Sequence, residues 1–340
     1  FFFVEKLGQP RELMPILKPY YLIFLAGLLP MAVFNVFAQW SFGVRNTSMP
    51  MWILLGANML NIVGNYMLIY GNWGAPELGL TGAGISTLCA RITAALAIMG
   101  VFFFKRSSEE YRRGFREAAA QRLRSLTGTV VRTSWPVAAQ MTFETGAFSS
   151  CAIFAGWLGT VSLAAFQVTI VVSTLGFCIY YSIGTAIAVT VANDAGRGSL
   201  RDCRRSAFSG YAVMLVFAAL SSAALAMFGR PLMHLFSDDT AVLALAGTVI
   251  IPLLLYQLGD ATQIAFSNAL RGTSKVMPMV WIAFVSYMMA GLPSTYLLAF
   301  TAGLGIYGLV LSFSVSLFLA AALFLYFFMR ATRPKEATHA

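Results

Sequence analysis

The chain has 340 residues, of which 59% are hydrophobic and only 11% are charged, and its formal net charge is +10. An ordinary soluble domain carries about 25% charged residues. The composition therefore excludes a disordered chain and a typical cytosolic enzyme, and it favours a protein whose surface lies in lipid.

Nine apolar stretches follow one another along the chain, each long enough for a helix that crosses a bilayer. We predict membrane spans at residues 19–42, 50–71, 79–104, 133–158, 162–192, 206–228, 241–269, 277–300 and 305–329. The predicted fold class is an all-α polytopic membrane protein.

The longest link between these spans covers residues 105–132 and holds eight Lys and Arg with three Glu between them. We interpret it as a cytoplasmic connector in solvent or on the membrane surface. It divides the chain into residues 1–104, the last three helices of an N-terminal bundle, and residues 133–340, a C-terminal bundle of six helices.

The basic residues are distributed unevenly between the links. When the links are assigned to alternate sides of the membrane, one side carries 18 of the 23 Lys and Arg and the other side carries four. Basic residues gather on the cytoplasmic side of membrane proteins. The positive charge therefore predicts a cytoplasmic C-terminus, and it is not evidence for a nucleic-acid partner.

The sequence contains an internal repeat. Residues 46–50 (Asn-Thr-Ser-Met-Pro) resemble residues 272–278 (Gly-Thr-Ser-Lys-Val-Met-Pro), and residues 78–82 resemble residues 304–308 at the same offset of 226. The offset covers six predicted spans, so the repeats run parallel in the membrane. Spans four to six have no repeat partner here, so we expect three preceding spans and a parent of twelve, with about nine in this fragment.

Three charged residues lie inside predicted spans, where a charge is costly and indicates function. They are Arg91, Glu144 and Asp260. Glu144 follows Arg132 by 12 residues and Asp260 precedes Arg271 by 11, which places both acids roughly 17 Å from the cytoplasmic edge of the membrane. We predict a paired acidic site, provided that the two spans face one cavity.

Two polar residues share the helix face of Asp260, because Tyr256 lies four residues before it and Gln263 three residues after it. A buried carboxylate pair can bind a proton, and Glu144 and Asp260 with the Tyr256 hydroxyl also form a possible Na⁺ site of hard oxygen ligands. An organic cation can compete for the same charge. The alternative is that both acids are neutral and only hydrogen-bond between helices.

Further polar residues lie in the second and third spans. Asn61 and Asn65 share one helix face, and they either line a cavity of the first bundle or bond across helices. Arg91 has no obvious acidic partner in this fragment, and three interpretations stay open: it pairs with a carboxylate on a preceding helix, faces a polar cavity or donates to backbone carbonyls.

Common enzyme motifs are absent or misplaced. The sequence contains no GxxxxGK[ST], HExxH or GxSxG, and its GxGxxG match at residues 303–308 lies between two apolar spans instead of after a strand. The four cysteines form no CxxC pair. We therefore expect a transporter without a cofactor, coupled to Na⁺ or H⁺, and not an enzyme.

Seven short segments together resemble the multidrug and toxic compound extrusion (MATE) transporters, in their bacterial NorM-like branch. The segments are residues 61–71, 80–84, 143–146, 156–159, 256–260, 269–272 and 291–293. The resemblance covers the whole chain as helices four to twelve of the family.

The resemblance implies two six-helix bundles around a central cavity, which export cationic, amphipathic compounds in exchange for Na⁺ or protons by alternating access. It implies that Glu144, Tyr256 and Asp260 form the cation site of the second bundle, and that Asn61 and Asn65 are polar positions of the first. We expect a monomer in the bacterial inner membrane, with the lipid bilayer and small organic cations as its partners.

A flippase for a lipid-linked precursor is the alternative function. Such a protein would need a cavity ringed by Arg and Lys to bind a pyrophosphate, and Arg91 is the single basic residue inside a predicted span.

Overall fold

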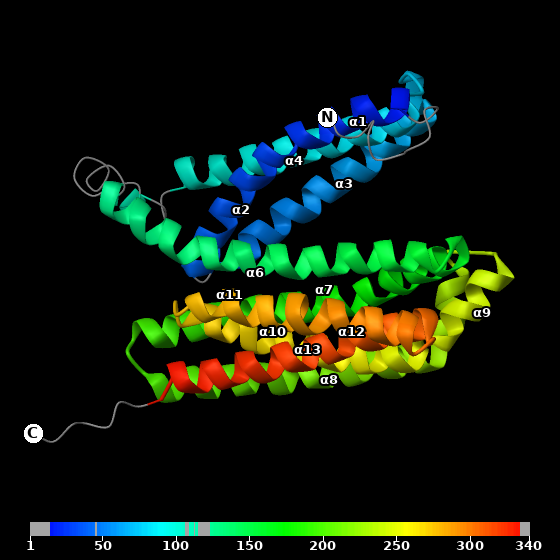
Figure 1. Cartoon of the computed structure of the whole chain (residues 1–340). Helices are drawn as coiled ribbons and strands as arrows, with labels where there is room; N and C mark the ends of the chain where they lie inside the picture. The colour runs from blue at the N-terminus through cyan, green and yellow to red at the C-terminus, as the bar shows by residue number, and fades with distance from the viewer. Residues whose placement is uncertain (1–13, 45, 106–108, 112, 115–122, 334–340) are drawn as a thin grey trace, which may run out of the picture. The chain divides into compact units, whose positions relative to one another are not determined.

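The computed structural model describes residues 14–44, 46–105, 109–111, 113–114 and 123–333, and every regular element among them is helical. The chain separates into two compact units, Phe1–Leu123 and Arg124–Ala340. Each unit is described by itself below, and Figure 1 labels their helices.

The described part of the first unit consists of long helices and a short 3₁₀ turn, η3 (Asn72–Gly74). The α-helices are α1 (Met14–Ala26), α2 (Leu28–Gly43), α3 (Ser48–Tyr70) and α4 (Gly79–Phe104). Helix α4 packs against the other three. Helix α3 ends at Gly71, whose φ of 68° is left-handed and therefore suits glycine.

The second unit is built around one central helix, α10 (Ile250–Gly272), in which nearly every residue from Tyr256 onward is buried. Helix α10 packs most extensively against α13, and then against α7 and α8. The elements around it are α6 (Leu123–Trp157), α7 (Thr160–Gly196), α8 (Leu200–His234), α9 (Thr240–Thr248) and α13 (Gly305–Ala331). A continuous helix of mixed type, α11 (Met277–Ala283), η5 (Phe284–Gly291), α12 (Leu292–Tyr296) and η6 (Leu297–Thr301), completes the unit.

Seven of the described helical segments are long and apolar enough to cross a membrane, or up to eight if α9 and α10 count as one broken span. This number is smaller than the nine predicted spans, and the difference lies in α6. Helix α6 covers the predicted span 133–158, but Gln140, Glu144 and several Ser and Thr lower its hydropathy. It begins at Leu123, so the last part of the predicted connector 105–132 is helical, and much of the rest lies outside the described residues.

Two predicted spans are irregular where proline removes a backbone donor. Helices α9 and α10 meet at an angle of 55° at Val249, and Pro252 cannot donate to the carbonyl of Thr248. Pro293 cannot donate to Met289, and the eight residues before α12 form a π-helix. The predicted spans 241–269 and 277–300 are therefore helical but not straight α-helices.

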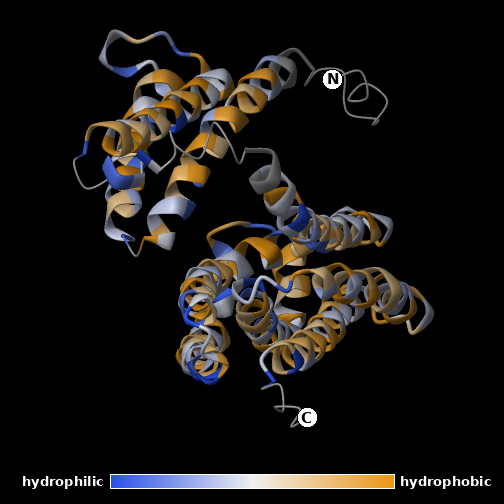
Figure 2. Cartoon of the chain, turned by 90° about the vertical axis from the view of Figure 1, so that its left-hand side faces the viewer, coloured by the Kyte–Doolittle hydropathy of each residue, from blue (hydrophilic) through white to orange (hydrophobic). Residues whose placement is uncertain are grey.

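Large apolar side chains are exposed along the helices of both units. In the first unit Leu29 is 74% exposed and Trp52 is 67% exposed, and in the second unit Met227 is 72% exposed. In Figure 2 the helices are coloured mainly for apolar residues. This surface suits contact with lipid tails and not with water.

The two copies of the internal repeat have the same local geometry. Helices α4 and α13 begin at equivalent glycines, Gly79 and Gly305, with φ of 52° and 55°. One turn later, a Cβ on Gly82 would lie 2.6 Å from the carbonyl carbon of Leu68, and a Cβ on Gly308 would lie 2.7 Å from that of Leu298. The repeat therefore preserves a close approach of a helix start to the helix before it.

We expect Gly82→Ala and Gly308→Ala each to destabilise the protein by about 1–3 kcal/mol, because the added methyl group must displace backbone. The matched control is Gly100→Ala in α4, where a Cβ meets nothing within 4 Å and alanine favours the helix. Thermal unfolding of the purified protein in detergent measures the difference. Unfolding of Gly308→Ala at the wild-type temperature would contradict the close approach.

Candidate functional site

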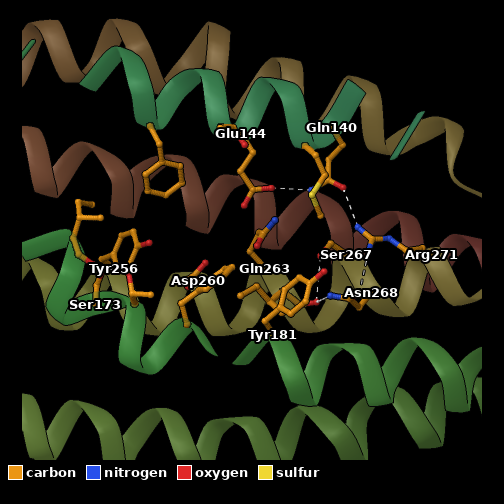
Figure 3. A pocket seen from close by; sticks show the side chains of 17 residues that line it. Gln140, Glu144, Ser173, Tyr181, Tyr256, Asp260, Gln263, Ser267, Asn268 and Arg271 are labelled. Carbon is orange, nitrogen blue, oxygen red and sulfur yellow. Dashed lines mark hydrogen bonds between the residues drawn. The ribbon is translucent and has the colours of Figure 1, made fainter. Parts of the chain in front are cut away.

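Glu144 and Asp260 line one cavity of about 260 Å³ inside the second unit. Glu144 comes from α6 and Asp260 from α10, and Figure 3 shows them on opposite walls, pointing toward the same space. Helix α7 supplies the remaining wall. The sequence placed both acids at the same estimated depth in the membrane, and the structure brings them to one cavity.

Polar side chains form a stripe along one face of α10 that follows the helical repeat from Tyr256 to the last turn. The members that line the cavity with Asp260 are Tyr256, Gln263, Ser267, Asn268 and Arg271. All of them except Arg271 are at least nine-tenths buried. Because α10 is the central helix of the unit, this stripe lies away from the lipid-facing surface, where polar groups would be most costly.

Asp260 has an incompletely partnered carboxylate. The residue is only 3% exposed, and its Oδ2 atom is buried without a hydrogen-bond partner. The Oε1 atom of Gln263, one turn away, is also buried without a partner. Two buried acceptor oxygens without a protein donor cost free energy, and a proton, a cation or water in the cavity can satisfy them.

Glu144 has a different environment, since a neighbouring amide satisfies one of its oxygens. The Gln140 side chain donates from Nε2 to Glu144 Oε2 at 2.9 Å, one helical turn away on α6. The Gln140 Oε1 atom accepts in turn from Arg271 Nη2 at 3.4 Å. Glu144 and Arg271 are thereby linked through Gln140, as the dashed lines in Figure 3 show.

Aromatic rings form the end of the cavity next to Asp260. The Tyr256 ring meets Phe148 edge-on at 6.4 Å and Phe313 at 6.0 Å between centroids. Phe148 also stacks on Phe313 at 4.6 Å. Tyr256 is 6% exposed and lines the cavity, so its position agrees with the predicted grouping with Asp260.

Sequence reasoning missed Tyr287. It is 1% exposed, its hydroxyl lies within electrostatic range of Glu144, Asp260 and Tyr256, and the hydroxyl makes no hydrogen bond of ordinary geometry. Tyr287 lies in the π-helical segment η5, whose wider turn alters which side chains face inward. An apolar sequence with one tyrosine gives no signal of such a turn.

Sequence reasoning also gave no role to Gln140 and treated Arg271 only as the marker of a span end. A signal was present, because Gln140 precedes Glu144 by four residues and Arg271 continues the stripe of Asp260 along α10.

The polar residues predicted in the first unit lie in part around a second cavity, of about 420 Å³. Asn61 and Arg91 line this cavity, and Asn65 is not among its lining residues. Asn61 donates to Ser86 at 3.3 Å and to Thr87 at 3.2 Å, and Asn65 donates to Asn61 at 3.2 Å. The two bonds from Asn61 join α3 to α4, and the bond from Asn65 lies within α3.

Arg91 stacks its guanidinium over the ring of Phe24, 5.1 Å from the centroid. Cation–π contact therefore accounts for part of its placement within an apolar helix.

No group of three or more His, Cys, Asp or Glu that could hold a metal ion occurs among the described residues. The donors around the cavity of the second unit are carboxylate, amide and phenol oxygens. Oxygen donors of this kind suit a proton or a hard cation such as Na⁺ and do not suit zinc or copper.

Comparison with known proteins gives consistent similarities. Residues 136–297 match the family model MatE. The multidrug resistance protein MdtK of Edwardsiella ictaluri (strain 93-146) is 32% identical over 261 residues, which are 76% of this chain and 56% of that protein. The chain thus spans 56% of the length of this curated relative.

Solved structures share the fold. The eukaryotic MATE transporter AtDTX14 matches with a TM-score of 0.84 and 19% identity, covering 97% of this chain and 73% of that chain. The Vibrio cholerae MATE transporter VcmN in its bent form matches with a TM-score of 0.79 and 17% identity, covering 97% and 73%. With its long apolar helices, the chain is an all-α polytopic membrane protein.

We expect Asp260→Asn to stabilise the protein by about 1–3 kcal/mol in buffer without added salt. Burial of Asp260 requires either an unpaired charge or the uptake of a proton, and the neutral amide requires neither. Asp239→Asn is the control, because Asp239 caps α9 at the surface and asparagine caps equally well. A lower unfolding temperature for Asp260→Asn would show that the carboxylate is satisfied.

Proposed function

We propose that this chain exports organic cations in exchange for Na⁺ or protons by alternating access, because it matches the MatE family model over residues 136–297 and resembles MATE transporters in fold. The observation that carries the proposal is the carboxylate pair on one cavity, with Glu144 half-buried, Asp260 buried and acceptor oxygens unpaired. A monovalent cation that reaches this site is attracted by the carboxylates and by the unpaired acceptor oxygens.

Exchange follows from competition for the same charge. The cavity of about 260 Å³ has room for a small ion with its remaining water, or for the charged end of a larger compound. Occupation by one cation excludes another from Asp260. If Na⁺ or H⁺ binds from one side and the organic cation from the other, their mutual exclusion couples the two movements.

The lining of the cavity supports an amphipathic organic cation as the substrate. Phe148, Phe177 and Tyr181 line it together with the carboxylates. Aromatic faces attract cations and apolar groups, and carboxylates supply the charge. The similar protein from Edwardsiella ictaluri is named a multidrug resistance protein.

The proposed location is a bacterial inner membrane with the C-terminus in the cytoplasm. The bias of Lys and Arg toward one set of links supports this orientation. The flippase alternative is not favoured, because the cavity of the second unit carries two carboxylates and one arginine, a poor match for a pyrophosphate.

We expect Asp260→Asn and Glu144→Gln to reduce gradient-driven transport of a fluorescent organic cation to the background of vesicles that lack the protein. Removing either negative charge weakens the attraction that both cations share. Uptake into everted membrane vesicles under an imposed Na⁺ gradient, and then an imposed proton gradient, measures this and identifies the coupling ion.

Asp202→Asn is the matched control for these two variants, because Asp202 is an exposed residue in the first turn of α8. It should transport at the wild-type rate. Unchanged transport by both cavity variants would contradict the proposal, as would the absence of wild-type transport under both gradients.

A further inference from the structure

The Arg271 guanidinium extends from the last turn of α10 into the same cavity as the acids, and Figure 3 shows it at the far end from Tyr256. Its Nη2 donates to Gln140 Oε1 at 3.4 Å and its Nη1 donates to Asn268 Oδ1 at 3.5 Å. Its Nε is buried without a partner. An arginine placed only to complement a helix end would direct these donors to the last carbonyls.

The guanidinium is held loosely. Both of its hydrogen bonds are at the long limit of ordinary geometry, whereas the bond between Gln140 and Glu144 is 2.9 Å. A guanidinium has five donor hydrogens, and these two contacts use neutral amide oxygens. Among the described residues no carboxylate lies within ion-pairing distance of Arg271, and its charge reaches Glu144 through Gln140.

The formal charges of the cavity can be counted. Among the residues that line it, only Glu144, Asp260 and Arg271 carry a formal charge. Arg271 offsets one carboxylate, and the link through Gln140 assigns that carboxylate as Glu144. One negative charge is left, and the unpaired Oδ2 atom places it on Asp260.

We propose that Arg271 is an internal counter-charge, held toward Glu144 by Gln140, which limits this site to one monovalent cation with Asp260 as its main ligand. The inference rests on the proposed function, because it specifies which cations the same site accepts. Gln140 and Arg271 are positioning residues in this scheme, since neither is required as a ligand of the cation.

The proposal makes a statement about divalent cations. Two carboxylates with amide and phenol oxygens would suit Ca²⁺ if no arginine were present. With Arg271 in the cavity, a divalent cation adds one positive charge more than the walls can neutralise. The arginine therefore excludes divalent cations by charge and not by size.

The experiment measures thermal unfolding of the purified protein in lipid nanodiscs with and without CaCl₂, in buffer that contains no other added salt. Arg271→Gln and Gln140→Glu each leave two excess negative charges on the cavity wall. We expect millimolar Ca²⁺ to raise the unfolding temperature of both variants by several degrees and to leave wild type unchanged. Equilibrium binding of ⁴⁵Ca²⁺ should give about one ion per variant protein.

Two controls separate charge from packing. Arg271→Lys keeps the positive charge, so Ca²⁺ should leave its unfolding temperature unchanged. Arg204→Gln removes an arginine of α8 that donates to Thr332 and to the Met329 carbonyl away from the cavity, so it should lower the unfolding temperature without gaining a response to Ca²⁺.

The proposal is overturned if neither Arg271→Gln nor Gln140→Glu responds to Ca²⁺ when both are folded, or if wild type binds Ca²⁺ as tightly as they do. If Arg271→Gln does not fold, Gln140→Glu decides the matter alone, because it retains the arginine. The measurement needs no transport and no ion gradient, so its failure leaves the antiport proposal standing, and a failure of antiport leaves this measurement unaffected.

Discussion

The cost of burying a carboxylate with an unpaired oxygen is the constraint on which the second unit depends. Asp260 lies on the central helix, and the helices around it leave 3% of its surface exposed. It cannot turn toward water, and no donor in the described structure reaches its Oδ2 atom. Such a residue weakens the fold until a proton or a cation arrives, which makes occupation of the cavity and stability of the bundle two aspects of one equilibrium.

Another buried polar side chain of α10 has hydrogen-bond partners on the neighbouring helices. Gln257, three residues before Asp260, is 3% exposed, yet its Oε1 accepts from Tyr180 at 3.2 Å and from Ser221 at 2.9 Å. This cluster joins α7, α8 and α10 and leaves no acceptor bare. Asp260 Oδ2 and Gln263 Oε1 lack such donors, and Arg271 Nε and the Tyr287 hydroxyl are also without partners in the same unit. Such exceptions in a well-packed core mark candidate functional sites.

The sequence predicted the helical class, which is confirmed, because hydropathy is a local property. Counting residues from the basic span ends placed Glu144 and Asp260 only at matching depth, and the structure adds that both line one cavity. The turn that presents Tyr287 and the bend at Val249 depend on how proline-containing helices pack against neighbours. The place of Arg271 on the stripe of Asp260 could be read from the helical spacing, but its contact with Gln140 depends on how α6 packs beside α10. The roles assigned to the site residues remain predictions.

An exchanger needs a site that releases its cation as well as binds it, since a cation held too tightly would never leave for the other side. Two uncompensated carboxylates in a dry cavity would hold a monovalent cation strongly, because Coulomb attraction grows as the local dielectric falls. If a single carboxylate bound the cation, the second acid in the cavity would have no role in binding. An arginine linked to Glu144 through Gln140 gives cation binding an intermediate strength, because the arginine already neutralises part of the negative charge of the cavity. In the proposed exchanger, the long hydrogen bonds of the guanidinium would let it move when a substrate with a larger charged group enters. The asymmetry of the two carboxylates would then set how easily the cation is exchanged, and the arginine would set how many cations the site accepts.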